Sequence, residues 1–364
     1  MLTEQKGSLP VLQGYDVQPV LDKPLLFGDI AAVTGGESLC SARCLGCYDT
    51  AGKFTLEAIR TGRQPLTTEQ WLEVIDELGP YIQTLMLSST AEPTSITNWP
   101  GHQRMIDQAL EDGLFVILYT NGLTMNQPMV DWIKARDGLS VNGKWYHPDP
   151  KTNDRMMGLK RLEEAYVVRD GQTIPLHLAL LLDAGLTERS YRLGAGNTLY
   201  QQNADAVPDM WSWLREHHII PTFSWPVRTG AGAIAARRFG IPPEQLEKLT
   251  RRCHEIDGEQ GILWELGMGP HIGATACADH WMLFLGPFGD ALQCASSRQP
   301  PFGNVMDDGG VAELIRRKAL YDADLAPMRA GASGRATCVC NECATGIGAP
   351  GPLNVVYVNE SSNL

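Results

Sequence analysis

Three cysteines in one short run constrain this chain more than any other feature of its sequence. They are Cys40, Cys44 and Cys47, in the order Cys-Ser-Ala-Arg-Cys-Leu-Gly-Cys. Three thiolates on one loop can ligate three irons of a [4Fe–4S] cube and leave the fourth iron open to another ligand, whereas zinc and ferredoxin clusters ask for four protein ligands. The nearest downstream histidine is His102. The spacing therefore predicts a cluster with one open iron, and the alternative is three buried structural thiols.

Composition narrows the class of protein. The chain has 364 residues, 43% of them apolar, and the length predicts two domains. The N-terminal residues do not resemble a signal peptide, and no apolar run reaches the roughly 18 residues of a membrane span, so we expect a cytoplasmic protein without a membrane partner. Nine cysteines then indicate metal ligation in a reducing compartment rather than disulfides. A formal net charge of −12 disfavours nucleic acid as a partner.

Short apolar runs alternate with amphipathic stretches from about residue 26 to 240, a pattern typical of βαβ units with a parallel sheet. The predicted helices cover Glu69–Leu78, Gln103–Leu110 and Met129–Ala135. The predicted strands are Phe27–Val33, Thr84–Ser88, Phe115–Thr120, Leu139–Val141, Leu176–Leu182 and Ile219–Ser224. In barrels built from such β/α units, the functional groups gather at the carboxyl ends of the strands. The cysteine run begins just after the first predicted strand.

The cysteine run and this pattern together resemble the radical S-adenosylmethionine (radical SAM) superfamily. The resemblance implies a partial (β/α)6 TIM-like barrel at residues 26–261, preceded by an extension at 1–25 and followed at 262–364 by a small iron–sulfur domain and tail. It also implies that SAM binds the open iron, that an electron from the cluster releases a 5′-deoxyadenosyl radical, and that this radical abstracts a hydrogen atom from substrate. An electron donor such as flavodoxin or ferredoxin is the implied protein partner.

Further residues match elements that radical SAM enzymes use to hold SAM. The segment Ser88-Ser89-Thr90-Ala91-Glu92-Pro93 is similar to the family's Gly-Gly-Glu-Pro segment, which implies that Thr90, Ala91 and Glu92 meet the methionine amino group. The family usually has an aromatic residue before the third cysteine, where this chain has Gly46, so Tyr48 is the candidate for the adenine contact. The remaining candidates for cofactor or substrate contact follow later strands: Asn121, Asn142, Lys144, Trp145, Trp225 and Arg228.

Each of these assignments has a structural alternative. The Glu92 segment is also a plain loop that ends in proline, with a solvated glutamate. Asn121-Gly122 is a strong turn signal in its own right, and Arg228 is as well explained by a surface salt bridge.

A second cysteine group lies near the C-terminus. Gly289-x4-Cys294 followed by Phe302-Gly303-Asn304-Val305 resembles the start of the SPASM or shorter twitch domain that follows many radical SAM barrels. The resemblance implies one auxiliary [4Fe–4S] cluster, ligated by Cys277, Cys294, Cys340 and Cys343, with Cys338 as an alternative ligand. Four thiolates leave no iron open, and a structural zinc is the competing occupant.

Cys253 stands apart from both groups. It lies on an apolar stripe at helical spacing with Leu246, Leu249 and Ile256, which favours a packed core thiol. The alternative is that it donates a hydrogen atom to a substrate radical, as a lone cysteine does in some radical SAM epimerases.

The expected activity is hydrogen abstraction from a C–H bond of a small natural-product substrate. The resemblance extends to the amino-cyclitol dehydrogenase and sugar epimerases of aminoglycoside biosynthesis, which implies oxidation or epimerisation of a sugar, amino-cyclitol or aminoglycoside-like molecule. The alternative is a SPASM-type maturase that modifies a ribosomally made peptide. A scaffold without catalytic activity is the third interpretation.

Overall fold

The computed structural model describes most of the chain between residues 23 and 331. The described residues are 23–35, 40–88, 90–160, 165–188, 192–227, 229–262, 264, 266, 271–272, 282–295, 297 and 300–331, with side chains in the last helix as far as residue 322. Predictions that concern Arg228, Cys277, Cys338, Cys340 and Cys343 lie outside these residues.

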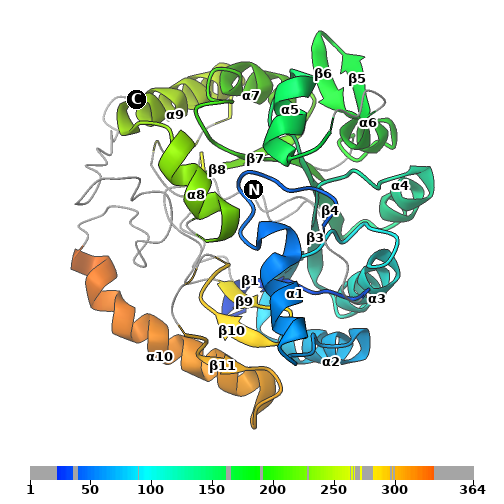
Figure 1. Ribbon diagram of the computed structural model, residues 1–364, viewed down its shortest axis with the longest axis vertical. Helices are drawn as coiled ribbons and strands as arrows, with labels where there is room; N and C mark the ends of the chain where they lie inside the picture. The colour runs from blue at the N-terminus through cyan, green and yellow to red at the C-terminus, as the bar shows by residue number, and fades with distance from the viewer. Residues whose placement is uncertain are drawn as a thin grey trace.

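A sheet of parallel strands forms the centre of the molecule, as predicted for a partial barrel (Figure 1). Six of its strands follow chain order, and each pairs in parallel with the next: β1 (Leu25–Ile30), β2 (Ile82–Leu87), β3 (Phe115–Thr120), β4 (Leu139–Lys144), β7 (Leu193–Thr198) and β8 (Ile220–Ser224). Helices connect these strands and lie outside them: α2 (Thr68–Leu78), α3 (Trp99–Glu111), α4 (Gln127–Lys134), α6 (Leu176–Asp183), α7 (Val207–Glu216) and α9 (Pro243–Glu259).

Helix α2 illustrates why the outer helices form where the sequence predicts them. Thr67 and Gln70 make a reciprocal capping box, which satisfies N–H groups of the first turn. Trp71, Ile75 and Leu78 then recur at helical spacing, and all three are 0% exposed in the main core. Burial of one such side chain contributes about 1.5–3 kcal/mol, so the apolar stripe fixes which face of the helix meets the sheet.

One predicted strand is wrong. The run that begins at Leu176 forms helix α6, and the fifth strand of the barrel is β7, at Leu193–Thr198. Helix α6 is apolar on nearly all sides, and periodicity alone does not separate a buried helix from a buried strand. The sequence of β7, Leu-Gly-Ala-Gly-Asn-Thr, has one β-branched residue, Thr198, and no aromatic residue, so its pairing with β4 and β8 overrides local propensity.

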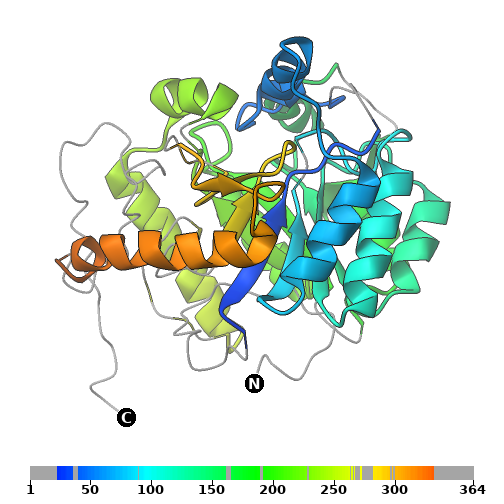
Figure 2. The ribbon, with the colours of Figure 1, turned by 90° about the horizontal axis from the view of Figure 1, so that it is seen from below.

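The carboxyl ends of the parallel strands point to one side of the molecule, which we call the mouth of the barrel. In Figure 2 the arrow of β1 points to this side, and α1 (Lys53–Arg60) and α8 (Gly230–Phe239) lie there. Helix α5 (Pro150–Met157) follows β4 at the same side and leads to the β5–β6 hairpin, made by Tyr166–Arg169 and Gln172–Pro175.

The chain after residue 282 extends the same sheet. Strand β9 (Met282–Leu285) pairs in parallel with β1, and β10 (Asp290–Leu292) and β11 (Gly303–Asn304) continue it in antiparallel order. Gly289, with φ +80°, and Asn304 meet in this hairpin, since the Asn304 side chain donates to the Phe288 carbonyl at 2.8 Å. The two halves of the predicted twitch-like motif are therefore brought together, while the division into domains at residue 262 stays a prediction.

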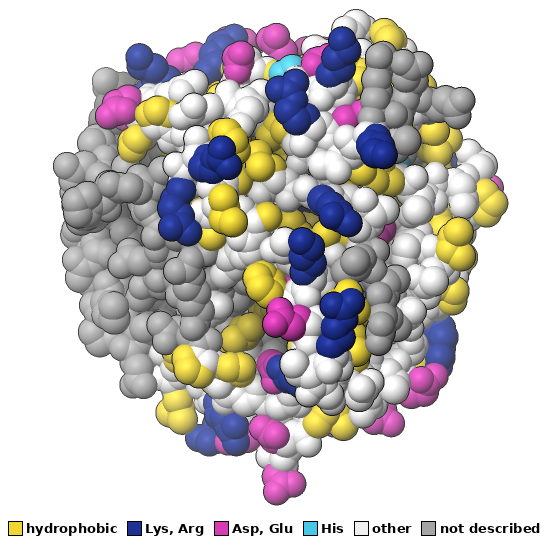
Figure 3. Space-filling view, in the orientation of Figure 1, with side chains coloured by type: hydrophobic (Ala, Val, Ile, Leu, Met, Phe, Trp, Pro, Cys, Tyr) yellow, Lys and Arg dark blue, Asp and Glu magenta, His cyan; other side chains and the backbone are white. Residues whose placement is uncertain are grey.

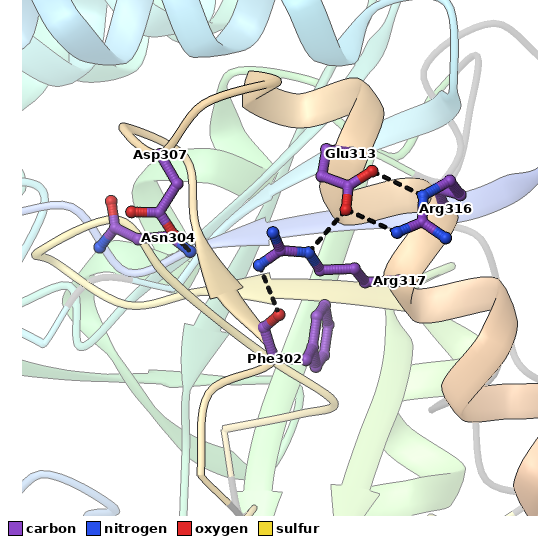
Figure 4. A network of polar contacts seen from close by, with 6 residues as sticks. All are labelled: Phe302, Asn304, Asp307, Glu313, Arg316 and Arg317. Carbon is purple, nitrogen blue, oxygen red and sulfur yellow. Dashed lines mark hydrogen bonds and ion pairs between the residues drawn. The ribbon is translucent and has the colours of Figure 1, made fainter.

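Helix α10 (Gly310–Gly331) is tied to this hairpin by Arg317. Its guanidinium donates to the Phe302 carbonyl at 3.2 Å and pairs with Glu313, which also binds Arg316 (Figure 4). Within the described part of the chain, no helix combines the length and apolar character needed to cross a bilayer.

Candidate functional site: a thiol trio at the mouth of the barrel

The loop that carries the thiol trio, Cys40, Cys44 and Cys47, is held from two sides at the mouth. On one side the N–H groups of Arg43 and Leu45 donate to the carbonyls of Met157 and Met156, both at 2.8 Å. On the other side the N–H of Gly232, in the first turn of α8, donates to the Cys47 carbonyl at 3.2 Å. Backbone contacts of this kind fix the loop independently of its side chains, so the three thiols start from a defined geometry.

Glycines permit these close approaches. A Cβ at Gly230, where φ is +55°, would lie 2.3 Å from the Tyr48 carbonyl oxygen, and one at Gly46 would lie 3.0 Å from the Thr198 side chain. The second contact explains the departure from the family pattern, because a bulky aromatic side chain at position 46 would collide with the end of β7.

Hydrogen bonds from Ala51 and Asn121 reach the sulfur atoms of Cys47 and Cys40. The N–H of Ala51 donates to Cys47 Sγ at 3.0 Å, and Asn121 Nδ2 donates to Cys40 Sγ at 3.3 Å. Thr50 and Ala51 have φ values of +50° and +61°, a region that costs a residue with a side chain about 1–2 kcal/mol. This strain aims a backbone N–H at the sulfur, as is common at functional sites.

Burial sets the pKa values of the three thiols. Cys40 and Cys44 pack against a small apolar cluster made by Ala42, Tyr146, Met156, Met157, Tyr200 and Ala235. Burial raises the pKa of Cys40 to about 12 and that of Cys44 to about 11, and it also raises the pKa of Cys47. Free thiols at this site would stay protonated near neutral pH, so formation of thiolates requires a metal that displaces the protons.

Glu92 connects the loop after β2 to the end of β3. Its buried carboxylate accepts four hydrogen bonds, from the Thr94 N–H at 3.1 Å, the Thr94 hydroxyl at 2.6 Å, the Thr120 hydroxyl and the Asn121 N–H at 2.8 Å. Burial raises the pKa of Glu92, and these donors oppose the shift. The carboxylate lies within electrostatic range of Cys40 and Cys44. It therefore adds negative charge beside the trio and positions Asn121, which in turn contacts Cys40.

The other predicted contacts take different positions. Thr90 and Ala91 are buried beside Glu92. The Tyr48 hydroxyl donates to the Ser88 carbonyl at 2.9 Å, and its ring packs edge-on to Phe284. Trp145 is 0% exposed and packs against Trp213 in the main core. Gly122 has φ +73°, so the Asn-Gly turn exists together with the contact from Asn121 to Cys40.

Polar side chains line the interior of the barrel below the trio. Asn142 donates to the Thr222 hydroxyl at 2.7 Å, and Gly196 on the intervening strand leaves room for Asn142 and Lys144. Burial lowers the pKa of Lys144, while nearby Cys44, Cys47 and Glu92 oppose that shift. Lys144 thus brings a positive charge close to the thiols from the end of β4.

Several buried polar atoms near the mouth have no partner among the described residues. They are Thr90 Oγ1, Asn142 Oδ1, His177 Nε2, Tyr200 OH and Thr229 Oγ1. An unsatisfied buried group costs about 1–3 kcal/mol, which a bound polar ligand would recover. No three His, Cys, Asp or Glu side chains in the described ranges converge on the position of a single ion, and thiolates that bind different irons of a cube need no such convergence. The three thiols and these unpaired polar atoms therefore fit an iron–sulfur cluster that carries a polar ligand.

Sequence reasoning missed two tyrosines. The Tyr146 hydroxyl hydrogen-bonds to Cys44 and Thr198. Burial raises the pKa of Tyr200, and the nearby Cys44 and Cys47 add to that shift. Both residues follow strands, which is the general signal for functional positions in a barrel, but β7 itself was not predicted.

Two further cysteines, Cys253 and Cys294, lie within the described residues. Cys294 is buried just after β10. Cys253 is 0% exposed on α9, within the main core between α9 and α7. This burial is what a packed core thiol requires.

Comparisons with known proteins agree with the architecture. No family model matches the chain. The mycofactocin maturase MftC of Mycobacterium tuberculosis is 22% identical over 339 residues, which cover 86% of this chain and 79% of MftC. Streptococcus suis SuiB, solved with S-adenosylmethionine, superposes with a TM-score of 0.56 at 12% identity over 81% of this chain and 68% of SuiB. The chain has the fold of SuiB. SuiB with its precursor peptide SuiA also superposes, with a TM-score of 0.58 at 12% identity, over 85% of this chain and 68% of SuiB.

Proposed function

We propose that this protein is a radical SAM enzyme that modifies a peptide. The observation that carries the proposal is the thiol trio, which lies at the mouth of a barrel with the fold of SuiB. Cys40, Cys44 and Cys47 would hold three irons of a [4Fe–4S] cluster, and SAM would bind the fourth. When bound, the reduced cluster supplies the electron that cleaves SAM and so begins hydrogen abstraction.

The chain's own residues prepare this site. Glu92, Asn121 and Lys144 set the charge around the thiols, and Asn121 and Ala51 donate hydrogen bonds to sulfur. The unpaired hydroxyls of Thr90 and Tyr200 offer hydrogen bonds to the polar groups of SAM. Asn142 and Lys144 in the barrel interior are available to orient the substrate.

The likeness to MftC and to the SuiB complex with its precursor peptide supports a peptide substrate better than the sugar-like substrate placed first by sequence. An auxiliary cluster on Cys277, Cys294, Cys340 and Cys343, with Cys338 as the alternative ligand, belongs to the same proposal. The meeting of Gly289 and Asn304 in the hairpin that leads to Cys294 supports it.

The test begins with the cluster. After anaerobic reconstitution and reduction, the protein is expected to convert SAM to 5′-deoxyadenosine. Cys44→Ala is expected to abolish this conversion, because one iron loses its ligand. Cys253→Ala is the matched control, since it removes a thiol from the core instead of the mouth. A loaded cluster that never cleaves SAM would refute the proposal.

The substrate class is tested in parallel arms. One arm adds a library of short synthetic peptides and the other a panel of amino-cyclitols and amino sugars, with 5′-deoxyadenosine and the mass of each candidate as readouts. Excess cleavage and a mass change with peptides support the proposal. The same response to amino-cyclitols or amino sugars alone would overturn the peptide assignment.

A further inference from the structure

Unpaired cationic side chains crowd the mouth of the barrel. Eight Lys and Arg residues there are exposed, and no ion pair is found for them among the described residues: Arg43, Lys53, Arg60, Lys151, Arg155, Lys160, Arg237 and Arg238. They come from the trio loop, α1, α5 with the residues after it, and α8, and we call this set the basic rim. Figure 3 shows Lys and Arg side chains gathered on the face that carries these helices.

The basic rim is unlike the rest of the described surface. Away from it, arginines form ion pairs with neighbouring acids: Arg104 with Glu69, Arg136 with Asp107, Arg169 with Asp183, Arg251 with Glu247, Arg252 with Glu255, and Arg316 with Glu313. Helices α1, α5 and α8 together carry one exposed acid, Glu57, and Asp149 lies directly before α5. An unpaired basic surface on a chain with a net charge of −12 is a local concentration of positive potential, which attracts an acidic ligand.

Apolar side chains complete this surface. Phe54 on α1 is 57% exposed and Ile234 on α8 is 59% exposed. The two helices belong to one assembly, since Gly232 of α8 bonds to the trio loop that leads into α1. Exposed apolar side chains among cations suit a polypeptide, which carries both acidic and apolar groups.

We propose that the basic rim binds an acidic segment of the peptide substrate and holds it across the mouth, with Phe54 and Ile234 contacting apolar residues of that segment. The inference rests on the proposed peptide-modifying function and adds the charge of the substrate to it. Because surface charges act over about 10 Å at moderate ionic strength, the rim guides the peptide to the thiol trio before close contacts form.

The test compares two charge-matched variants of the full chain, reconstituted with its cluster and SAM. The rim variant is K53Q/R60Q/R237Q/R238Q, and the control, K134Q/K248Q/R251Q/R316Q, has the same net charge but leaves the rim intact. The probe is a fluorescent synthetic peptide of Glu, Ala and Leu, with its Gln counterpart and single-stranded DNA alongside. Circular dichroism verifies that both variants are folded.

We expect the wild-type protein to bind the Glu peptide more tightly than the Gln peptide, with an affinity that falls as salt rises. The rim variant is expected to lose about tenfold or more in affinity, and the control less than about threefold. Equal affinity for the two peptides, equal losses in both variants, or tighter binding of DNA would each overturn the inference.

Binding is read without turnover, so the two proposals fail separately. A protein that binds the Glu peptide through the rim but never cleaves SAM keeps the docking surface and loses the proposed function. A protein that modifies peptides without regard to their charge keeps the function and loses the acidic-substrate inference.

Discussion

Gly230 allows α8 to approach the trio loop, and replacing it with alanine tests whether that approach holds the loop. A Cβ at this position would lie 2.3 Å from the Tyr48 carbonyl oxygen and 2.6 Å from the Cys47 carbonyl oxygen, and the residue has φ +55°. Left-handed backbone costs about 1–2 kcal/mol and overpacking about 1–3 kcal/mol, so Gly230→Ala is expected to lose about 2–5 kcal/mol of unfolding free energy. It is also expected to load less iron, because relief of the clash displaces the Cys47 backbone.

Substitutions at two other glycines separate the cost of backbone strain from the cost of overpacking. Gly62 has φ +99°, and a Cβ there would meet nothing within 4 Å, so Gly62→Ala isolates backbone strain and is expected to lose about 1–2 kcal/mol. Gly258 lies in α9 with open space around it, and Gly258→Ala is expected to gain about 0.5–1 kcal/mol. Urea unfolding and iron content per chain after anaerobic reconstitution are the measurements. A Gly230→Ala variant that matches Gly62→Ala in stability and the wild type in iron would refute the reasoning.

Three further predictions concern buried groups. Burial raises the pKa of Asp29 to about 7, so the contribution of its neutral form to stability is complete below about pH 4 and is lost as the pH rises through about 7. Asp29→Asn should therefore remove about 4 kcal/mol of the pH dependence of the unfolding free energy. Urea-unfolding curves in which the two proteins change stability in parallel across this pH range would contradict the prediction. Asp257→Asn should cost about 3–5 kcal/mol because it leaves Arg215 buried without its carboxylate, whereas Glu247→Gln, which removes an exposed ion pair on the same helix, should cost less than about 1 kcal/mol in the same urea assay. Cys253→Ala should lose about 1 kcal/mol and keep wild-type 5′-deoxyadenosine formation, with no solvent deuterium in the product; SAM cleavage without substrate modification would instead assign hydrogen donation to this thiol.

The sequence predicts most of the barrel because its strands follow simple rules. Phe115–Thr120 is predicted with its observed bounds, since a run of apolar and aromatic residues ends there at a turn signal. Strand β7 escapes prediction because Gly194, Ala195 and Gly196 form a strand only when β4 and β8 lie on either side. Local propensity carries no information about such neighbours.

The candidate site likewise has a part that the sequence predicts and a part that it does not. The thiol trio is local, so its spacing along the chain is sufficient to find it. The contacts of Tyr146 with Cys44 and of Gly230 with Tyr48 join residues about 100 to 180 positions apart, and one sequence does not show such pairings. The glycine-rich start of α8 is visible in the sequence, but its reason, close approach to the trio loop, needs the structure.

The anchors of the trio loop also set an order of events during synthesis. Residues 40–47 emerge from the ribosome early, yet Met156, Met157 and Gly232, whose backbones grip them, are made much later. A nascent chain that ends before residue 156 lacks all three anchors, so the spacing of its three sulfur atoms is not fixed. Iron delivered at that stage would meet a loop without a defined geometry. We therefore expect the iron–sulfur cluster to assemble after Gly232, the last of these anchors, has been translated.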